Sequence, residues 1–308
     1  MVHLLFNSGS RIRIILFALL GAGLNLFLAC NAFAQEHANH NRIYNSTLKT
    51  YELIWELAAQ TDYRNGGIDQ TFGKPVLQGG VGTLLPGGFY IANWNSTVST
   101  GAGYPGAFIE TDIFGGWLKQ VGDLRMNTGI YSVFYPGSNV ANYAKSPLYG
   151  RLTSGMVHNG EVFFGLGYKQ WYFQQNVNFT NVSNMVGPNG GTTAGSGYSN
   201  LMGDFPIAWD FAGGGWTAIS HAGYQYMRNY SASNYVDWKF GLEKKLAGYW
   251  HINLLYTQTN AKGNCSIAAT TAQPYCFSQS TSASGVNSGP TKNAGGAAII
   301  FNIIAKNY

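Results

Sequence analysis

The stretch over residues 51–71, YELIWELAAQTDYRNGGIDQT, decides how the rest of the chain is interpreted. In its first half Tyr51, Leu53, Trp55 and Leu57 share one face of an extended strand. The other face carries Glu52, Glu56 and Gln60, so one face suits an apolar solvent and the other suits water. A helix is the competing interpretation, because Leu, Glu and Ala favour helices and two of the leucines lie four residues apart. The Asn-Gly-Gly turn signal that follows favours the strand, as does recurrence of the same pattern towards the C-terminus.

The N-terminus has the features of a secretory signal peptide. Two basic residues, Arg11 and Arg13, precede an apolar stretch, and Ala32-Phe33-Ala34 fits a cleavage site of the A-x-A type. We therefore expect residues 1–34 to be removed on secretion. An uncleaved membrane anchor is one alternative, although the apolar run is short for a spanning helix. A lipoprotein acylated on Cys30 is another, although the residues before this cysteine fit that signal poorly.

The mature chain, residues 35–308, is expected to form one domain of unusual composition. Charged residues make up 10% of the sequence and aromatic residues 15%, there are 41 glycines, and the mean hydropathy is -0.07. Soluble domains carry about 25% charged residues. No apolar run after the signal reaches the roughly 18 residues of a transmembrane helix. This combination is typical of the lipid-facing alternation of a transmembrane β-barrel, with a secreted β-sandwich as the alternative.

The charge balance is close to neutral. Subtracting Arg11 and Arg13 from the 18 basic residues leaves 16 against 13 acidic residues, which gives the mature chain a net charge of +3. This excess is too small and too scattered for nucleic-acid binding, so we expect no nucleic-acid partner.

Period-two alternation predicts twelve strands along the mature chain. The predicted strands cover residues 48–61, 75–84, 88–97, 107–118, 124–135, 147–156, 161–173, 201–210, 216–228, 235–245, 250–259 and 293–305. Five short and six long connections alternate between them, as expected for periplasmic turns and extracellular loops. The predicted fold is therefore all-β: a transmembrane antiparallel up-and-down β-barrel of about 12 strands.

The predicted strands differ in how clearly they show the alternation of a β-strand. The strand over 161–173 is among the clearest, because five apolar or aromatic residues share one of its faces. The residues on that face are Val162, Phe164, Leu166, Tyr168 and Tyr172. The strand over 201–210 is the weakest, because Pro206 cannot donate a hydrogen bond to a neighbouring strand and requires a bulge or a position at the rim.

Short motifs in the first half of the mature chain resemble a known family. They are TDYRNGGIDQT (61–71), KPVLQGG (74–80), GFYIANW (88–94), ETDIFGGW (110–117), GIY (129–131) and YPG (135–137). Their composition and order resemble the opening of the TorF family of outer-membrane porins. The resemblance implies a bacterial outer-membrane barrel that forms a channel. Arg64 is displaced relative to the arginine of the family motif, so no role is carried over to it.

The end of the chain and the cysteines fit a secreted barrel. Tyr308 follows an apolar strand and resembles the C-terminal aromatic signal that the outer-membrane barrel assembly machinery recognises, which makes this machinery an expected partner. Cys30 leaves with the signal peptide, so Cys265 and Cys276 form the remaining pair, both in the longest predicted loop. We expect a disulfide between them, with free thiols as the alternative. Two thiolates without a nearby histidine do not complete a metal site, so no metal is expected.

Patterns for catalysis or cofactor binding are nearly absent. Ser220 and His221 are adjacent, so on a strand they point to opposite faces and cannot act as a pair. The Gly-Leu-Gly stretch at 165–167 lies within a predicted strand and not before a helix, so it forms no phosphate cradle. We expect no enzymatic activity and no cofactor. A barrel lipase is the less favoured alternative, and His221 is expected to face the lumen.

The polar faces of the predicted strands supply the candidate functional residues. The expected channel-lining residues are Glu52, Glu56, Glu110, Asp112, Arg125, Arg151, Lys169, His221, Asp237, Lys239 and Glu243. Acidic residues of the first and fourth strands would face basic residues of the fifth to seventh, a field that favours small polar or zwitterionic solutes. We predict a porin-like passive channel for small polar solutes or ions, surrounded by outer-membrane lipid. The alternative is a plugged structural or adhesive barrel that acts through its loops, because small barrels fill their interiors with side chains.

Overall fold

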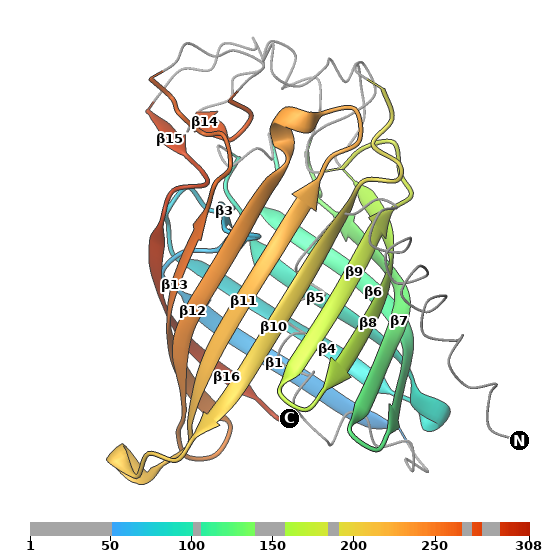
Figure 1. Ribbon diagram of the computed structural model, residues 1–308, viewed down its shortest axis with the longest axis vertical. Helices are drawn as coiled ribbons and strands as arrows, with labels where there is room; N and C mark the ends of the chain where they lie inside the picture. Colours follow the sequence, from blue (N-terminus) through green and yellow to red (C-terminus); the bar gives the residue numbers. More distant parts are fainter. Residues whose placement is uncertain (1–50, 101–105, 139–157, 184–190, 267–272, 279–289) are drawn as a thin grey trace, which may run out of the picture.

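The computed structural model describes residues 51–100, 106–138, 158–183, 191–266, 273–278 and 290–308. These residues form a closed antiparallel barrel of twelve strands (Figure 1). In chain order the strands are β1 (Glu52–Gln60), β4 (Val76–Leu84), β5 (Phe89–Thr97), β6 (Ile109–Val121), β7 (Leu124–Phe134), β8 (Asn159–Tyr168), β9 (Trp171–Asn178), β10 (Gly197–Ile207), β11 (Trp216–Tyr226), β12 (Tyr235–Lys245), β13 (Trp250–Thr259) and β16 (Ala298–Lys306). Each strand pairs with the barrel strands before and after it in the chain, and β1 closes the ring on β16.

Ten of the predicted strands are confirmed as barrel strands, with shifts at their ends. The prediction of one strand over 161–173 is wrong, because β8 and β9 form a hairpin that turns at Lys169 and Gln170. The predicted strand over 147–156 lies outside the described residues, and β7 pairs directly with β8. Pro206 lies in the last part of β10, beyond the residues that pair with β9, which is the rim position expected for a proline.

Side chains alternate between the two surfaces of the barrel wall. In β1, Leu53 and Leu57 are 54% and 58% exposed, whereas Ile54, Glu56 and Ala58 are buried. Exposed apolar side chains continue around the outside on the other strands: Val81, Phe89, Ile91, Ile113, Ile130, Val162, Phe164, Leu201, Val236, Phe240, Leu254, Ile299, Phe301 and Ile303. An apolar surface of this extent suits the hydrocarbon interior of a membrane and not water.

The connections separate into a short-turn end and a long-connection end of the barrel (Figure 1). The short-turn end holds the connections over 85–88, 122–123, 169–170, 208–215 and 246–249. The long-connection end holds those over 61–75, 98–108, 135–158, 179–196, 227–234 and 260–297. The C-terminus lies at the short-turn end (Figure 1). The predicted division into five connections at one end and six at the other is confirmed, although the connections over 208–215 and 227–234 are equally long. The predicted turn at 158–160 is wrong because β8 begins there.

Aromatic side chains gather near the short-turn end. The rings of Trp55 and Tyr249 meet edge to face with centroids 5.6 Å apart. Beside the β10–β11 turn, Trp216 contacts both Trp209 and Phe211. Aromatic girdles of this kind mark the boundary between lipid and water in transmembrane barrels.

Three short 3-10 turns lie wholly within the described residues. They are Pro86–Gly88, Phe211–Gly213 and Ser231–Ser233. None of the helices in this part of the chain has the length and apolar character needed to cross a membrane.

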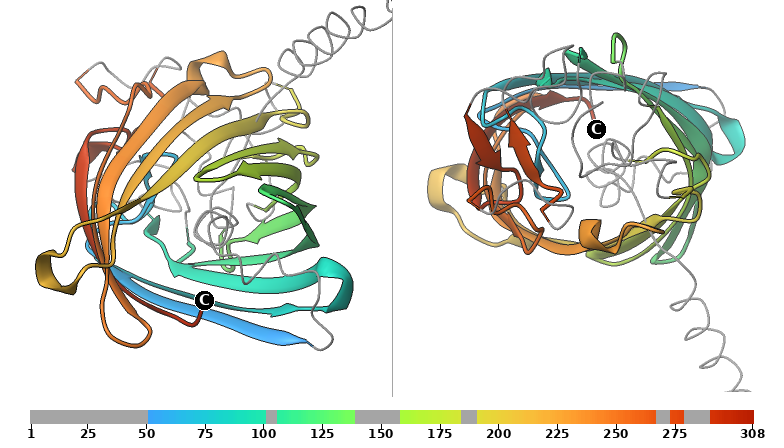
Figure 2. Two further views of the ribbon diagram at one scale, coloured as in Figure 1. Left: turned by 60° about the horizontal axis from the view of Figure 1, so that its bottom comes forward. Right: turned by 90° about the horizontal axis from the view of Figure 1, so that it is seen from above.

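Residues 61–75, the connection between β1 and β4, fold into the barrel and are called the inward loop below. They contain the short pair β2 (Arg64–Asn65) and β3 (Ile68–Asp69), which lies inside the ring of strands (Figure 2). The turn of this pair needs glycine, because Gly67 has φ 72° and a Cβ there would lie 2.2 Å from Cγ2 of Thr259. The Asn-Gly-Gly signal is thus confirmed as a turn, and it points into the lumen.

Candidate functional site: the barrel lumen

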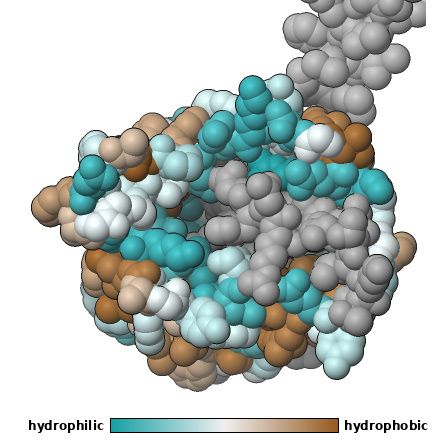
Figure 3. Space-filling model, turned by 90° about the horizontal axis from the view of Figure 1, so that it is seen from below, coloured by the Kyte–Doolittle hydropathy of each residue, from teal (hydrophilic) through white to brown (hydrophobic). Residues whose placement is uncertain are grey.

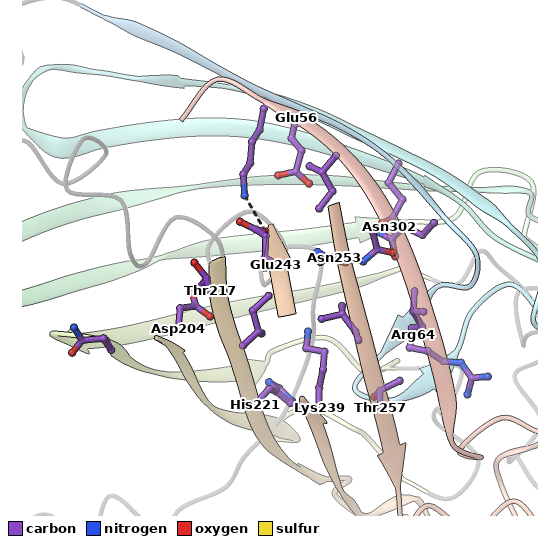
Figure 4. A pocket seen from close by; sticks show the side chains of 18 of the residues that line it. Glu56, Arg64, Asp204, Thr217, His221, Lys239, Glu243, Asn253, Thr257 and Asn302 are labelled. Carbon is purple, nitrogen blue, oxygen red and sulfur yellow. Dashed lines mark hydrogen bonds and ion pairs between the residues drawn. The ribbon is translucent and has the colours of Figure 1, made fainter. Parts of the chain in front are cut away.

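A cavity of about 640 Å³ occupies one side of the lumen. Its main wall consists of β11, β12, β13 and β16, which we call the cavity arc, and side chains of other strands, among them β1, β4, β7 and β10, also line it (Figure 4). The cavity reaches the short-turn end, where Gln120, Asp123 and Lys169 line it. Figure 3 shows that hydrophilic residues border a hollow at this end. Towards the other end the cavity meets Arg64 and Gly67 of the inward loop.

The cavity arc presents its side chains in rows, because directly paired residues of neighbouring strands share one face. One row runs through His221, Lys239 and Thr257. Two residues further along each strand, the next row holds Ile219, Gly241, Leu255 and Ile300. The third row holds Thr217, Glu243, Asn253 and Asn302. An apolar row therefore lies between two polar rows.

Glu243 is the centre of a charged group near the short-turn end. Its carboxylate lies 2.9 Å from Nδ1 of His251 and 3.7 Å from Nζ of Lys306. Beside this group the Tyr308 hydroxyl donates a hydrogen bond to Glu56. These contacts place acidic and basic groups together, so this end of the cavity favours neither sign of charge.

A second polar group lies next to the inward loop. Nε2 of His221 is 2.7 Å from Oδ1 of Asp237, and the Tyr198 hydroxyl donates to the same carboxylate. All three side chains are buried, and His221 and Asp237 line the cavity. Ser220, in contrast, points outward and donates to the carbonyl of Gly203. Ser220 and His221 are therefore separated by the barrel wall and do not form a nucleophile and base.

The opposite side of the lumen is filled by side chains. We call the wall formed by β5 to β9 the packed arc. Trp94, Tyr131 and Phe163 point inward from it and are at most 3% exposed. The carboxylates of Asp112 and Glu161 are buried among them, and Asn159 and Asn176 donate hydrogen bonds to Glu161. The apolar and aromatic residues of this region belong to the main core of the protein, which also includes residues of β1, β4 and the inward loop, such as Ile54, Val76 and Ile68.

The inward loop is held by a chain of ion pairs and hydrogen bonds. Nε of Arg64 donates to Asp62 at 2.6 Å, and its guanidinium also donates to the carbonyls of Ala294 and Gly296, both at 3.0 Å. Asp69 lies 3.5 Å from Arg64 and 2.5 Å from Nζ of Lys292. These contacts tie the loop to the chain segment that enters β16.

The other side of the inward loop is anchored to the packed arc. The hydroxyls of Tyr63 and Tyr135 donate to the two oxygens of Glu110, at 2.9 and 2.6 Å. Within the loop, Thr71 donates to Asp62 at 3.0 Å. Burial raises the pKa of the Asp62 carboxyl above 3.8, and the charge of nearby Asp69 raises it further, whereas Arg64 acts in the opposite direction.

The structure brings most of the expected channel-lining residues to the cavity, but in unequal roles. Those that line it are Glu56, Arg125, Lys169, His221, Asp237, Lys239 and Glu243. Glu110 and Asp112 belong to the packed arc, and Glu52 is half-buried at the short-turn end of β1. Arg151 lies outside the described residues. Of the acidic residues expected to face the basic strands, Glu56 lines the cavity together with Arg125 and Lys169, whereas Glu110 and Asp112 are buried in the packed arc.

Arg125 lines the cavity, but its hydrogen bonds stabilise the β8–β9 turn. Its guanidinium donates to the carbonyl of Lys169 at 2.5 Å and to that of Trp171 at 3.5 Å. Lys169 itself is in the β8–β9 turn with φ 52°, and its ammonium lies over the ring of Tyr168. These contacts fasten β7 to the β8–β9 turn.

Sequence reasoning missed several lining residues, namely Arg64, Asp204, Ile219, Asn253, Leu255, Ile300, Asn302 and Lys306. The aliphatic ones do not stand out in a search for polar lumen residues. Lys306 follows the same inward alternation as Ile304 and Tyr308, so the period of the last strand was a usable signal. Arg64 was noted in the sequence as part of a motif. Its lumen position could not be predicted, because its contacts are with the distant segment before β16.

A disulfide joins Cys265 and Cys276 beside the long-connection end. Cys276 begins β14 (Cys276–Ser278), which pairs with β15 (Thr291–Asn293). Next to it, the Tyr275 hydroxyl donates to the carbonyl of Ser233 at 2.7 Å. Among the described residues, no group of three or more His, Cys, Asp or Glu side chains is placed to hold a metal ion.

A closed antiparallel barrel with an apolar exterior, an aromatic girdle and a cavity lined by charged and amide groups defines a transmembrane β-barrel of the outer-membrane type. The chain belongs to the Gcw_chp family of bacterial proteins of unknown function, whose family model matches residues 46–284. The TorF resemblance predicted an outer-membrane barrel, and the structure agrees with it at the level of a closed transmembrane β-barrel, while the family that matches the chain is Gcw_chp. No curated protein matches the sequence.

Solved structures of similar shape include two porins and one enzyme. The KdgM porin shares 7% identity over 83% of this chain and 100% of its own, with a TM-score of 0.45. The NanC porin shares 8% identity over 83% of this chain and 100% of its own, with a TM-score of 0.43. Outer membrane phospholipase A from Escherichia coli shares 10% identity over 84% of this chain and 94% of its own, with a TM-score of 0.40. At these values we draw no functional conclusion from the likeness.

Proposed function

We propose that the protein is a passive outer-membrane channel for small polar solutes or ions. The observation that carries this proposal is the cavity of about 640 Å³ inside the closed barrel. Ten charged side chains line it, five basic and five acidic: Arg64, Arg125, Lys169, Lys239, Lys306, Glu56, Asp123, Asp204, Asp237 and Glu243. Burying charges costs free energy unless they are paired or solvated, so a cavity lined in this way is suited to water and polar solutes.

In this proposal the solute path follows the cavity arc. It begins at the short-turn end between Asp123 and Lys169, passes Glu243 and Lys239, and meets the inward loop at Arg64. The solute path is narrowest beside the inward loop, because this loop folds from the barrel wall into the lumen. Its ion pairs fix its position, which makes the constriction part of the folded barrel.

The proposal includes a location and an orientation. Residues 1–34 act as a signal peptide. The barrel assembly machinery recognises the C-terminal aromatic residue Tyr308 and inserts the mature chain into the outer membrane. The short turns then face the periplasm and the long connections face outward, as in bacterial outer-membrane barrels.

Planar-bilayer recording of the refolded mature protein tests the proposal. We expect stepwise conductance in simple salt solution. Lys239→Gln removes one cation from the path and should raise the preference for cations in the reversal potential. Lys119→Gln is the matched control, because Lys119 lies on the outer face of β6 and should leave the reversal potential unchanged. A folded wild type that never conducts would overturn the channel proposal.

A plugged structural barrel is the second candidate, and the packed arc is the observation that favours it. Trp94, Tyr131 and Phe163 fill one side of the lumen, and the inward loop occupies part of the other. In that case the long connections would carry the function. This candidate would be supported if the refolded protein did not conduct and if a partner protein bound to intact cells that carry the barrel but not to cells that lack it.

A further inference from the structure

We infer that the cavity arc carries a weak binding site for zwitterionic solutes with a short aliphatic side chain, such as valine. This inference rests on the proposed channel function and names the solute class that the channel favours. It begins with the row formed by Ile219, Gly241, Leu255 and Ile300, which we call the aliphatic row. These residues are directly paired across β11, β12, β13 and β16.

The aliphatic row is a continuous apolar band. Neighbouring strands lie about 4.8 Å apart, so the row extends roughly 14 Å around the wall. Ile219, Leu255 and Ile300 all line the cavity. A Cβ on Gly241 would lie 2.3 Å from Cδ2 of Leu255, so the leucine side chain covers the glycine and closes what would otherwise be a gap. The apolar surface therefore reaches from Ile219 to Ile300 without interruption.

Polar rows border this band on both sides. Lys239 and Thr257 lie on the side of the inward loop, and Glu243 and Asn253 lie on the side of the short turns. Inward residues of one strand are two positions apart, which separates adjacent rows by about 6.7 Å. A branched side chain of three or four carbons can rest on the band while the charged groups of the same solute remain beside a polar row. A solute that is polar throughout would leave the band in contact with water.

The charges of the wall favour a zwitterion over an ion. The cavity is lined by five basic and five acidic side chains, so its formal charge is zero with the histidine neutral. Lys239 and Glu243 point inward from the same strand, on either side of Gly241. Lys239 can attract the carboxylate of a solute whose side chain rests on the aliphatic row, and the zero net charge of the lining does not repel the ammonium of the same solute. The cavity is far larger than one amino acid, so such a solute stays partly hydrated and binds weakly enough to leave.

Valine and threonine provide a direct test, because they have nearly the same shape and differ by a methyl and a hydroxyl group. We would measure initial uptake of each labelled solute, at the same low concentration, into vesicles containing the refolded full-length mature protein. Since burial of a methyl group favours partition into the apolar band, wild type should take up valine about twice as fast as threonine. Leu255→Asn combined with Ile300→Asn should bring this ratio to about one, because both changes nearly keep side-chain size and remove the band.

Two further variants keep the test specific. Ile54→Asn places the same amide at a buried inward position that the cavity does not reach, so its valine preference should equal that of wild type. Thr257→Val extends the apolar band and should raise the preference. Heat-modifiable gel mobility would show that each variant is folded before uptake is compared.

The outcomes separate this inference from the channel proposal. Equal uptake of valine and threonine by wild type, or an unchanged ratio in the double variant, would overturn the aliphatic site while leaving the channel intact. If neither solute enters faster than into vesicles without protein, the channel proposal itself fails and the inference fails with it.

Discussion

The packed arc and the cavity arc are built by the same alternation of side chains, yet one side of the lumen is filled and the other holds a cavity. Both arcs place polar and charged groups inside the barrel. In the packed arc, aromatic side chains such as Trp94, Tyr131 and Phe163 accompany these groups. In the cavity arc the inward positions that border the cavity hold aliphatic, polar and charged side chains, such as Ile219, Thr257 and Lys239, and no tryptophan or phenylalanine.

The difference shows that inward side-chain volume, and not strand number alone, decides whether a twelve-stranded barrel has room for solutes. Barrels of eight strands are filled by side chains and those of about sixteen enclose a channel, so twelve strands allow either result. This protein adopts both, one on each side of the lumen. The following predictions test whether the two arcs are independent of each other.

The largest effect is expected from closing the cavity arc. Thr217 is half-buried, points inward from β11 and lines the cavity. Replacing it by tryptophan adds an aromatic ring like those of the packed arc, so Thr217→Trp should abolish most of the single-channel current. Thr128→Trp places the same ring on the outer, lipid-facing surface of β7 and should leave the current unchanged. Equal currents in wild type and Thr217→Trp would mean that solutes do not pass along this wall.

The next effect is a loss of stability in the packed arc without a matching gain of current. Trp94 is fully buried, and truncating a buried tryptophan costs about 3–5 kcal/mol in free energy of unfolding. Urea titration of Trp94→Ala in lipid vesicles should show a loss of this order, while the current changes little because the packed arc lies off the solute path. Trp250→Ala, at an exposed position, should cost less. A large rise in current would show that the arcs are connected.

A smaller effect is expected from releasing the inward loop. Arg64→Gln removes the charged hydrogen bonds to Asp62 and to the carbonyls of Ala294 and Gly296. Since hydrogen bonds to charged groups contribute about 1.5–3 kcal/mol, local opening of residues 61–75 should become easier by this order. Hydrogen exchange in the loop should speed up and the current should rise. Arg228→Gln, which removes one exposed hydrogen bond to the carbonyl of Ala194 in the β9–β10 connection, should change neither.

The smallest effect concerns Asp62, which lies outside the barrel strands. Its folded-state pKa is raised above 3.8, so the folded loop binds the proton more tightly than the unfolded chain does. The stability contribution of this proton is full below the unfolded pKa and is lost as pH rises through the raised pKa. Asp62→Asn should therefore gain slightly over wild type as pH rises from 4 to 7, in thermal unfolding followed by circular dichroism. If the stability of Asp62→Asn relative to wild type rose as the pH was lowered, the prediction would be contradicted.

The sequence predicted the direction of side chains better than the path of the chain. The outward positions of Leu53 and Leu57 and the bounds of β12 follow from period two alone, because lipid selects apolar residues on one face. The turn at Lys169 was missed because it contains no glycine and the strands on both sides are rich in aromatic residues. The total of twelve strands is confirmed although the predicted strand over 161–173 forms two strands, β8 and β9, and the predicted strand over 147–156 lies outside the described residues.

The lumen was less predictable, because its contacts join residues far apart in the chain. Arg64 reaches Ala294 and Gly296, and Tyr63 reaches Glu110, so the position of the inward loop depends on closure of the whole barrel. The polar residues of the lumen could be found from alternation. Which of them border a cavity could not, since that depends on the volume of side chains across the barrel.

Cysteine accessibility tests the central claim most directly, because it compares the two arcs within one channel. The mature chain has a convenient background, since Cys265 and Cys276 are joined in a disulfide. We would place single cysteines at Thr217, in the cavity arc, and at Gln174, which is buried in the packed arc. Each open channel would then receive a membrane-impermeant, charged methanethiosulfonate reagent. We expect the current of Thr217→Cys to fall on modification and that of Gln174→Cys to persist. Block at Gln174 equal to that at Thr217, or no block at Thr217, would contradict a solute path along the cavity arc.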